Sequence, residues 1–220
     1  MLARIEDYEA VIFDLDGTLV DSMGVWHEID VEFLGKRGIP VPEDLQQQIA
    51  GKSYEETAIY FKNRFHLPDS VESIKEEWKV MSMERYSKVP LKPGARELIL
   101  RLYASDVPMA IATSNSRELT ESCLSAHGLD GYFKTLVTGN EVIHGKPAPD
   151  VFLRAAKNMN VTPERCVVFE DLVNGILAGK TANMTVIAVA DQASKYQEDQ
   201  KRTIADRFIR DFNELGRVEL

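Results

Sequence analysis

The chain has 220 residues, of which 44% are hydrophobic and 28% charged, a composition typical of a globular protein and not of a disordered or fibrous one. Its formal net charge of −9 argues against nucleic acid as a partner, because affinity for nucleic acid comes largely from Lys and Arg on phosphates. The N-terminus is acidic and no apolar run approaches the roughly 20 residues of a membrane span, so we expect a cytoplasmic protein with no membrane partner.

Five short apolar runs, rich in β-branched residues, predict buried strands of a parallel sheet. They cover residues 10–13, 108–113, 135–138, 165–170 and 184–189, of which 135–138 is the weakest. Helical patterns alternate with these runs and cover residues 95–103, 116–126, 150–159 and 174–183. This alternation predicts an α/β fold with a doubly wound, mostly parallel, Rossmann-like sheet and right-handed crossovers.

One long stretch, between the first strand and the Pro93-Gly94 turn, contains no strand run. It predicts amphipathic helices, separated by loops with Gly and Pro, over residues 23–36, 43–50, 54–65 and 71–87. We therefore expect an α/β core of residues 1–20 and 91–220 with an inserted helical-bundle cap of residues 21–90. Such a cap would lie over the carboxyl end of the sheet, where α/β proteins bind ligands.

Pairs of carboxylates follow two of the predicted strands. Asp14 and Asp16 come directly after the run 10–13, in the sequence DLDGT, and Glu170-Asp171 comes at the end of the run 165–170. Carboxylates at the end of a buried strand are costly unless they bind a cation, and their hard oxygens suit Mg²⁺. Taken singly, each pair is also typical of a turn or of a helix N-cap.

Two further segments could contact a phosphate group. Thr113-Ser114-Asn115 ends the run 108–113 and offers hydroxyl and N–H groups at a strand-to-helix junction. Lys146 lies in the sequence GKPAPD, where two prolines rigidify the loop and the lysine can offer a compact charge to a phosphoryl group. Alone, each segment is typical of an ordinary N-cap or surface loop, but their order with the carboxylate pairs favours one shared site.

The four motifs, with a helical insert after the first, resemble those of the haloacid dehalogenase (HAD) superfamily, in particular its β-phosphoglucomutase-like subgroup. The resemblance covers essentially the whole chain and departs from the subgroup at Leu172, where serine is frequent. It implies an Mg²⁺-dependent phosphoryl-transfer enzyme that acts on a small phosphorylated metabolite. The resemblance makes Asp14 the nucleophile. Because a second aspartate, Asp16, follows it by two places, the resemblance favours phosphoryl transfer over removal of halide.

The resemblance also implies roles for individual residues. Asp14 would be the nucleophile that forms an aspartyl-phosphate, and Asp16 the acid and base. Phosphate would be held by Thr113, Ser114, Asn115 and Lys146. The metal would be held by Asp14, Asp16 (through its backbone carbonyl), Glu170 and Asp171.

The predicted cap bears on whether the final phosphate acceptor is water or a sugar. A β-phosphoglucomutase is described as having a histidine, an arginine and a lysine in the cap, and an ungapped alignment places Trp26, Tyr54 and Ser82 there. Without the arginine, which would hold a second phosphate, we expect a phosphatase acting on a sugar or sugar-alcohol phosphate. A phosphohexomutase is the alternative. Trp26, His27 and Lys52 are the candidates for contact with the leaving group.

Two other classes of protein stay open at this stage. A catalytically inactive relative could bind a phosphorylated metabolite and regulate a partner, and a receiver domain phosphorylated on aspartate also carries acidic loops and a lysine. A receiver domain would not need so large a cap. No apolar stripe demands a second copy, so we expect a monomer. Cys123 and Cys166 lie in no paired motif, and we expect no disulfide.

Overall fold

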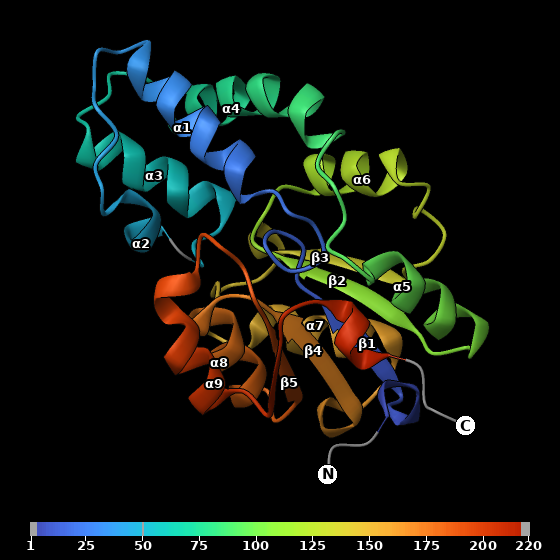
Figure 1. Cartoon of the computed structure of the whole chain (residues 1–220). Coiled ribbons are helices and arrows are strands. Elements are labelled where there is room, and N and C mark those ends of the chain that lie inside the picture. Colours follow the sequence, from blue (N-terminus) through green and yellow to red (C-terminus); the bar gives the residue numbers. More distant parts are fainter. Residues whose placement is uncertain (1–3, 50, 217–220) are drawn as a thin grey trace.

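The computed structural model describes residues 4–49 and 51–216, and in this part of the chain the core is one parallel sheet flanked by helices (Figure 1). The sheet contains six strands in the order β3-β2-β1-β4-β5-β6, and each neighbouring pair is parallel. The strands are β1 (Ala10–Phe13), β2 (Met109–Thr113), β3 (Thr135–Thr138), β4 (Cys166–Glu170), β5 (Thr185–Val189) and β6 (Arg207–Ile209). The predicted doubly wound α/β fold is confirmed.

Strand β1 lies in the middle of the sheet, and its four residues are fully buried. Its side chains alternate between two apolar layers, as the pleat of a strand requires: Val11 and Phe13 pack in one layer, and Ala10 and Ile12 in the other. The register pairs Phe13 with Ile111 of β2 and with Phe169 of β4. The segments that follow these three strands therefore leave the sheet at the same edge.

Helices cover both faces of this sheet. They are α5 (Ala95–Ala104), α6 (Arg117–Ala126), α7 (Asp150–Met159), α8 (Val173–Thr181) and α9 (Glu198–Ile204). Helices α7 and α8 pack on the layer that contains Ile12, and α5 and α6 on the layer that contains Phe13. Cys123 and Cys166 are buried free thiols, so the expected absence of a disulfide between them holds.

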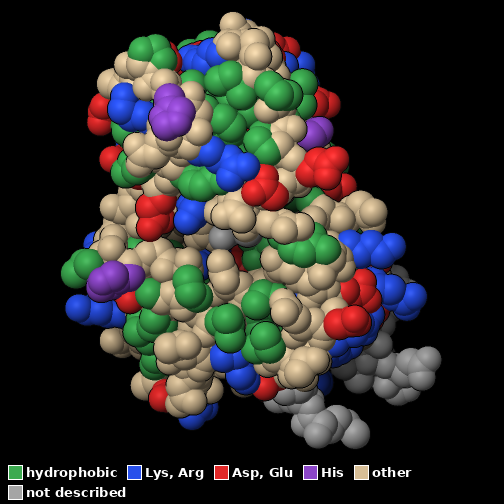
Figure 2. Space-filling view, turned by 90° about the vertical axis from the view of Figure 1, so that its left-hand side faces the viewer, with side chains coloured by type: hydrophobic (Ala, Val, Ile, Leu, Met, Phe, Trp, Pro, Cys, Tyr) green, Lys and Arg blue, Asp and Glu red, His purple; other side chains and the backbone are tan. Residues whose placement is uncertain are grey.

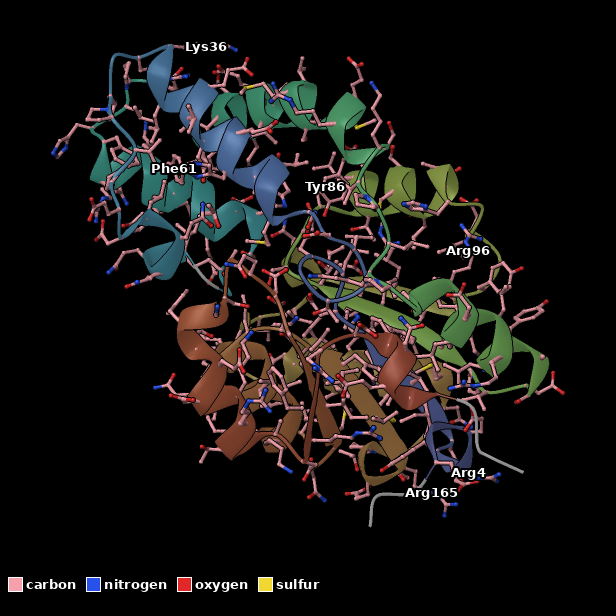
Figure 3. The ribbon with its side chains drawn as sticks, in the orientation of Figure 1. Arg4, Lys36, Phe61, Tyr86, Arg96 and Arg165 are labelled. Carbon is pink, nitrogen blue, oxygen red and sulfur yellow. The ribbon has the colours of Figure 1, made fainter. Side chains whose placement is uncertain are left out.

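The insert forms a separate layer of helices beyond the end of β1 (Figure 1). These helices are α1 (Met23–Gly35), α2 (Leu45–Ile49), α3 (Tyr54–Arg64) and α4 (Val71–Tyr86). Phe33, Phe61 and Trp78 pack at its centre, with ring centroids 5.5 Å apart for Phe33 and Trp78 and 4.8 Å apart for Phe61 and Trp78. Figure 3 shows Phe61 inside this layer. Ala50, the expected end of the second helix, and residues 1–3 and 217–220 lie outside the described residues.

The two connections between this layer and the core run side by side. The backbone N–H of Asp21 donates to Pro90 at 2.9 Å, and the N–H of Lys92 donates to Leu19 at 2.9 Å. Val20 and Leu91 form an antiparallel bridge between them. Among the residues that the structure describes, no helix combines the length and the apolar character needed to cross a membrane.

Candidate active site

The carboxyl edge of the sheet brings together the core residues that the sequence motifs singled out. Asp14 follows β1, Thr113 ends β2, Glu170 and Asp171 end β4, and Lys146 precedes α7; all five are buried. They line one cavity of about 160 Å³ together with residues of the helical insert. In Figure 2 the surface is indented where the helical layer meets the core.

Lys146 connects the two acidic motifs. Its Nζ atom donates to Asp14 Oδ1 at 2.7 Å and to Glu170 Oε1 at 2.6 Å. Although burial opposes it, the charges of Asp14 and Glu170 raise the pKa of Lys146, so its ammonium group stays charged. One fixed positive charge therefore lies between two carboxylates that are far apart in the sequence.

The acidic cluster has more negative charge than Lys146 can neutralise. Single oxygen atoms of Asp14, Glu170 and Asp171 all lie within 4.8 Å of one another. Burial raises the pKa of Asp14 to about 7, with Lys146 opposing this effect and Glu170 adding to it. Burial, followed by the charges of Glu170 and Asp14, raises the pKa of Asp171 well above its usual range. Three buried carboxylates with this excess of charge fit a divalent cation that prefers oxygen ligands.

Neighbouring groups fix the orientation of the cluster. Thr18 Oγ1 donates to Asp171 Oδ1 at 3.1 Å, and the backbone N–H of Leu172 donates to Glu170 Oε2 at 2.7 Å. Gly175 is needed for space, since a Cβ atom there would lie 1.8 Å from Glu170 Oε1. Hydrogen bonds to the outer oxygens of metal ligands are a common means of orienting such ligands.

Asp16 lies apart from this cluster and is held mainly by the helical insert. Its Oδ1 atom accepts hydrogen bonds from Ser22 Oγ at 2.5 Å, from Trp26 Nε1 at 3.0 Å and from the hydroxyl of Tyr86. Its Oδ2 atom accepts from Asn115 Nδ2 at 2.9 Å. Figure 3 shows Tyr86 at the end of α4 that is nearest the loop after β1. Both carboxylate oxygens are thus occupied, and the donors come from both parts of the chain.

The candidate phosphate ligands after β2 differ in what they contact. Thr113 Oγ1 accepts from the backbone N–H of Asn115 at 3.0 Å, which turns the chain tightly at the end of the strand. Ser114 Oγ donates to Gly51 in the insert at 3.4 Å. The side chain of Asn115 is directed to Asp16. Thr113, Ser114 and Asn115 all line the cavity.

The structure places at the cavity two of the three residues that were predicted to contact the leaving group. Trp26 and Lys52 line it, and Lys52 Nζ lies 5.9 Å from the centroid of the Tyr60 ring. His27 is exposed and is not among the lining residues, because one step along an α-helix rotates a side chain by about 100°. The expectation for His27 is therefore not met.

A second group of charges behind Asp171 was not predicted. Ser194 Oγ donates to Asp171 Oδ2 at 3.2 Å and accepts from Lys201 Nζ, a buried ammonium group, at 2.6 Å. Lys92 Nζ donates to Asp191 Oδ2 at 2.6 Å. Asp191 could have been found, since it lies two residues after the predicted strand 184–189. Lys201 lies in α9, a short helix that no sequence pattern predicts.

Comparisons with known proteins agree with this arrangement. The family model described as haloacid dehalogenase-like hydrolase matches residues 11–189. A bifunctional riboflavin kinase/FMN phosphatase from Arabidopsis thaliana is 38% identical over 180 residues, which are 81% of this chain and 48% of that protein. The chain thus spans about half the length of that relative.

Other relatives match along nearly their whole length. A probable pseudouridine-5'-phosphatase from Drosophila melanogaster is 31% identical over 207 residues, which are 91% of this chain and 90% of that protein. The crystal structure of CbbY from Rhodobacter sphaeroides in complex with phosphate has a TM-score of 0.85 and 26% sequence identity, and covers 95% of this chain and 96% of that chain.

Proposed function

We propose that the chain, which belongs to the haloacid dehalogenase-like hydrolase family as its motifs predicted, is a phosphatase that transfers phosphate from a sugar-like metabolite to Asp14 and then to water. The observation that carries this proposal is the position of Asp14. Its carboxylate lies in the cavity, bonded to Lys146 and within the cluster of buried carboxylates. As part of the same proposal, residues 1–20 and 91–220 form the catalytic core and residues 21–90 a cap.

In the first step Asp14 attacks the phosphorus atom, so that an O–P bond to Asp14 forms while the bond to the leaving alcohol breaks. Asp16 gives its proton to the departing oxygen. In the second step Asp16 takes a proton from water, which attacks the phosphorus and releases inorganic phosphate and free Asp14. A carboxylate nucleophile divides one difficult displacement into two easier ones.

We propose Mg²⁺ as the cation, held by Asp14, Glu170 and Asp171, with the backbone carbonyl of Asp16 as a further ligand. When bound, it supplies positive charge that offsets the repulsion between an anionic nucleophile and an anionic ester. Lys146 carries a second positive charge and, with Thr113, binds the outer oxygens of the phosphoryl group. The excess negative charge of the cluster supports this assignment.

The environment of Asp16 supports a link between the cap and the chemistry. Trp26 and Tyr86, both on helices of the insert, donate to the carboxylate that has to carry the proton. Asp16 can pass a proton to the leaving group only when one of its oxygens is released from these donors. Movement of the helical layer relative to the core would release it, and would do so while the layer contacts the substrate.

The residues around the cavity favour water over a second sugar as the phosphate acceptor. Within residues 4–49 and 51–216 the lysines that border the cavity are Lys52 and Lys146, and no arginine borders it. A second phosphate group would need a bidentate guanidinium of the kind a mutase cap supplies. Ser82, aligned with the lysine of a mutase cap, is buried inside α4 and donates to Lys79.

The test is phosphate release from a panel of phosphorylated sugars, sugar alcohols and nucleotides in the presence of Mg²⁺. Asp14→Asn and EDTA should each abolish release, whereas Asp130→Asn, at an exposed position, should not change it. Glucose 1-phosphate is assayed together with glucose 1,6-bisphosphate. If the protein interconverts glucose 1- and 6-phosphates faster than it releases phosphate, it is a mutase and the proposal of a phosphatase mechanism fails.

A further inference from the structure

The cavity extends from the carboxylate cluster into the helical insert, where its wall is mostly apolar. We call this region the apolar chamber; it is lined by Met23, Trp26, Ile29, Ile49, Tyr54 and Trp78. The chamber and the carboxylate cluster belong to one continuous cavity. The alcohol part of an ester whose phosphate lies at Asp14 would therefore extend into the chamber.

Three aromatic rings form one wall of the chamber. The centroids of Trp26 and Tyr54 lie 6.2 Å apart with an interplanar angle of 64°, and those of Tyr54 and Trp78 lie 5.7 Å apart at 74°. These are edge-to-face contacts of the kind that aromatic rings prefer. Tyr54 and Trp78 are buried, and Phe33 and Phe61 pack behind Trp78, so the wall is rigid before any ligand binds.

Two polar groups border the chamber without being part of the catalytic cluster. Asp30 is 5% exposed, and Gln46 Nε2 donates to its Oδ2 atom at 2.7 Å. Burial raises the pKa of Asp30 to about 7, so its carboxyl group can be a neutral donor as well as an acceptor near neutral pH. The indole N–H of Trp78 has no hydrogen-bond partner in the part of the chain that the structure describes, but it has almost no accessible surface, so Trp78 contributes its ring and not its N–H to the chamber.

This combination matches a flat ring better than a sugar. The carboxyl group of Asp30 and the carboxamide of Gln46, beside an apolar wall, can bond to the polar edge of a heterocycle, whose faces are apolar. A sugar presents hydroxyl groups on all sides and would leave several of them against apolar side chains.

We propose, on the basis of the proposed phosphatase function, that the substrate is a sugar phosphate that carries a six-membered heteroaromatic ring, which binds in the apolar chamber. The phosphorylated sugar spans the distance to Asp14. The ring contacts the aromatic wall, and its polar edge bonds to Asp30. Selectivity then comes from the ring and not from the sugar hydroxyl groups.

The direct test compares substrates that share the phosphorylated sugar and differ in the ring. Uridine 5'-monophosphate and cytidine 5'-monophosphate should each give a kcat/KM at least about tenfold above that of ribose 5-phosphate, the gain expected for one buried ring with one or two hydrogen bonds. Equal or better hydrolysis of ribose 5-phosphate than of both nucleotides would overturn the inference while leaving the phosphatase function intact.

Variants of the chamber separate recognition of the ring from folding. Trp78→Leu removes one ring of the aromatic wall but keeps an apolar side chain, and Asp30→Asn keeps the shape of the carboxyl group. Each should lower kcat/KM for the better nucleotide about fivefold more than for ribose 5-phosphate. Val80→Ala is the matched control, because this α4 side chain is 70% exposed. Equal losses on both substrates in both variants would contradict recognition of the ring.

If the protein releases no phosphate from any ester, the proposed phosphatase function is refuted. Binding of the ring can still be measured in that case, so the ring site is tested separately. The chain has two tryptophans, Trp26 and Trp78, and both line the chamber. Uridine 5'-monophosphate should therefore change the tryptophan fluorescence of the Asp14→Asn protein in a saturable way, and ribose 5-phosphate at the same concentration should change it less. An equal response to both, or none to the nucleotide, would overturn the proposal of a ring site.

Discussion

Replacing Asp30 by asparagine is expected to make the stability of the protein less sensitive to pH. Asp30 is buried on α1, and burial raises the pKa of its carboxyl group to about 7, with the bond from Gln46 acting in the opposite direction. Asparagine has the same shape, can accept the same bond and does not titrate. The substitution therefore removes one proton equilibrium and little else.

The sign and size of the effect follow from the two pKa values. In the unfolded chain Asp30 has an ordinary pKa of 3.8, so between pH 4 and pH 7 the folded state holds a proton that the unfolded state has lost. The contribution of Asp30 to stability is thus fully present below pH 3.8 and is lost as the pH rises through about 7. A difference of about 3 in pKa corresponds to about 4 kcal/mol in the free energy of unfolding.

The assay is urea denaturation of wild type and Asp30→Asn from pH 4.5 to pH 8, in EDTA so that no metal contributes. Other carboxylates titrate equally in both proteins, so the difference in free energy of unfolding between wild type and variant isolates the titration of Asp30. The free energy of unfolding of the variant, relative to wild type, should rise by about 3 kcal/mol across this range, because the unfolded chain has already lost most of its Asp30 proton at pH 4.5. A difference that stays constant within about 0.5 kcal/mol would refute the reasoning, since Asp30 would then titrate as an exposed group. The control Asp130→Asn should show no such trend.

Two further predictions concern the groups that hold the catalytic carboxylates. Tyr86→Phe removes one donor to Asp16 and should lower kcat about tenfold with little change in KM, because a hydrogen bond to a charged group is lost; an unchanged kcat would show that Tyr86 only packs. Gly175→Ala places a methyl group 1.8 Å from Glu170 Oε1 and should raise the Mg²⁺ concentration needed for half-maximal activity about tenfold or more. Gly24→Ala, where a Cβ atom meets nothing within 4 Å, is the matched control, and equal Mg²⁺ requirements in the two variants would contradict the role of Gly175.

The core of the fold could be predicted because most of its strands contain an uninterrupted apolar run, and β3, Thr135–Thr138, is weaker. Strand β6, Arg207–Ile209, was missed because it is a short strand at the end of the sheet whose first residue is exposed, so it has no such run. Helix α9 has only seven residues, and its buried residue is Lys201, which a hydrophobic pattern does not mark.

The candidate site was predictable to the extent that parallel strands end at one edge. That rule, applied to the apolar runs alone, places Asp14, Thr113 and Glu170 together. It could not identify what holds Asp16, because Tyr86 lies 70 residues along the chain and reaches Asp16 only through the packing of α4 on the core. Nor could it show that Trp78 and Asp30, on different helices, border one cavity.

The adjacent connections at Asp21 and Pro90 make the helical layer exchangeable as one cassette. The chain leaves the core and returns to it at a single point, so the core backbone needs no other adjustment to accept a cassette of different length or sequence. Within such a family, new substrates can arise by replacing one continuous gene segment while Asp14, Lys146 and Glu170 stay in place. A chimera with the helices of another member should keep phosphate release and take the donor's substrate preference; loss of folding would show that the two parts depend on each other.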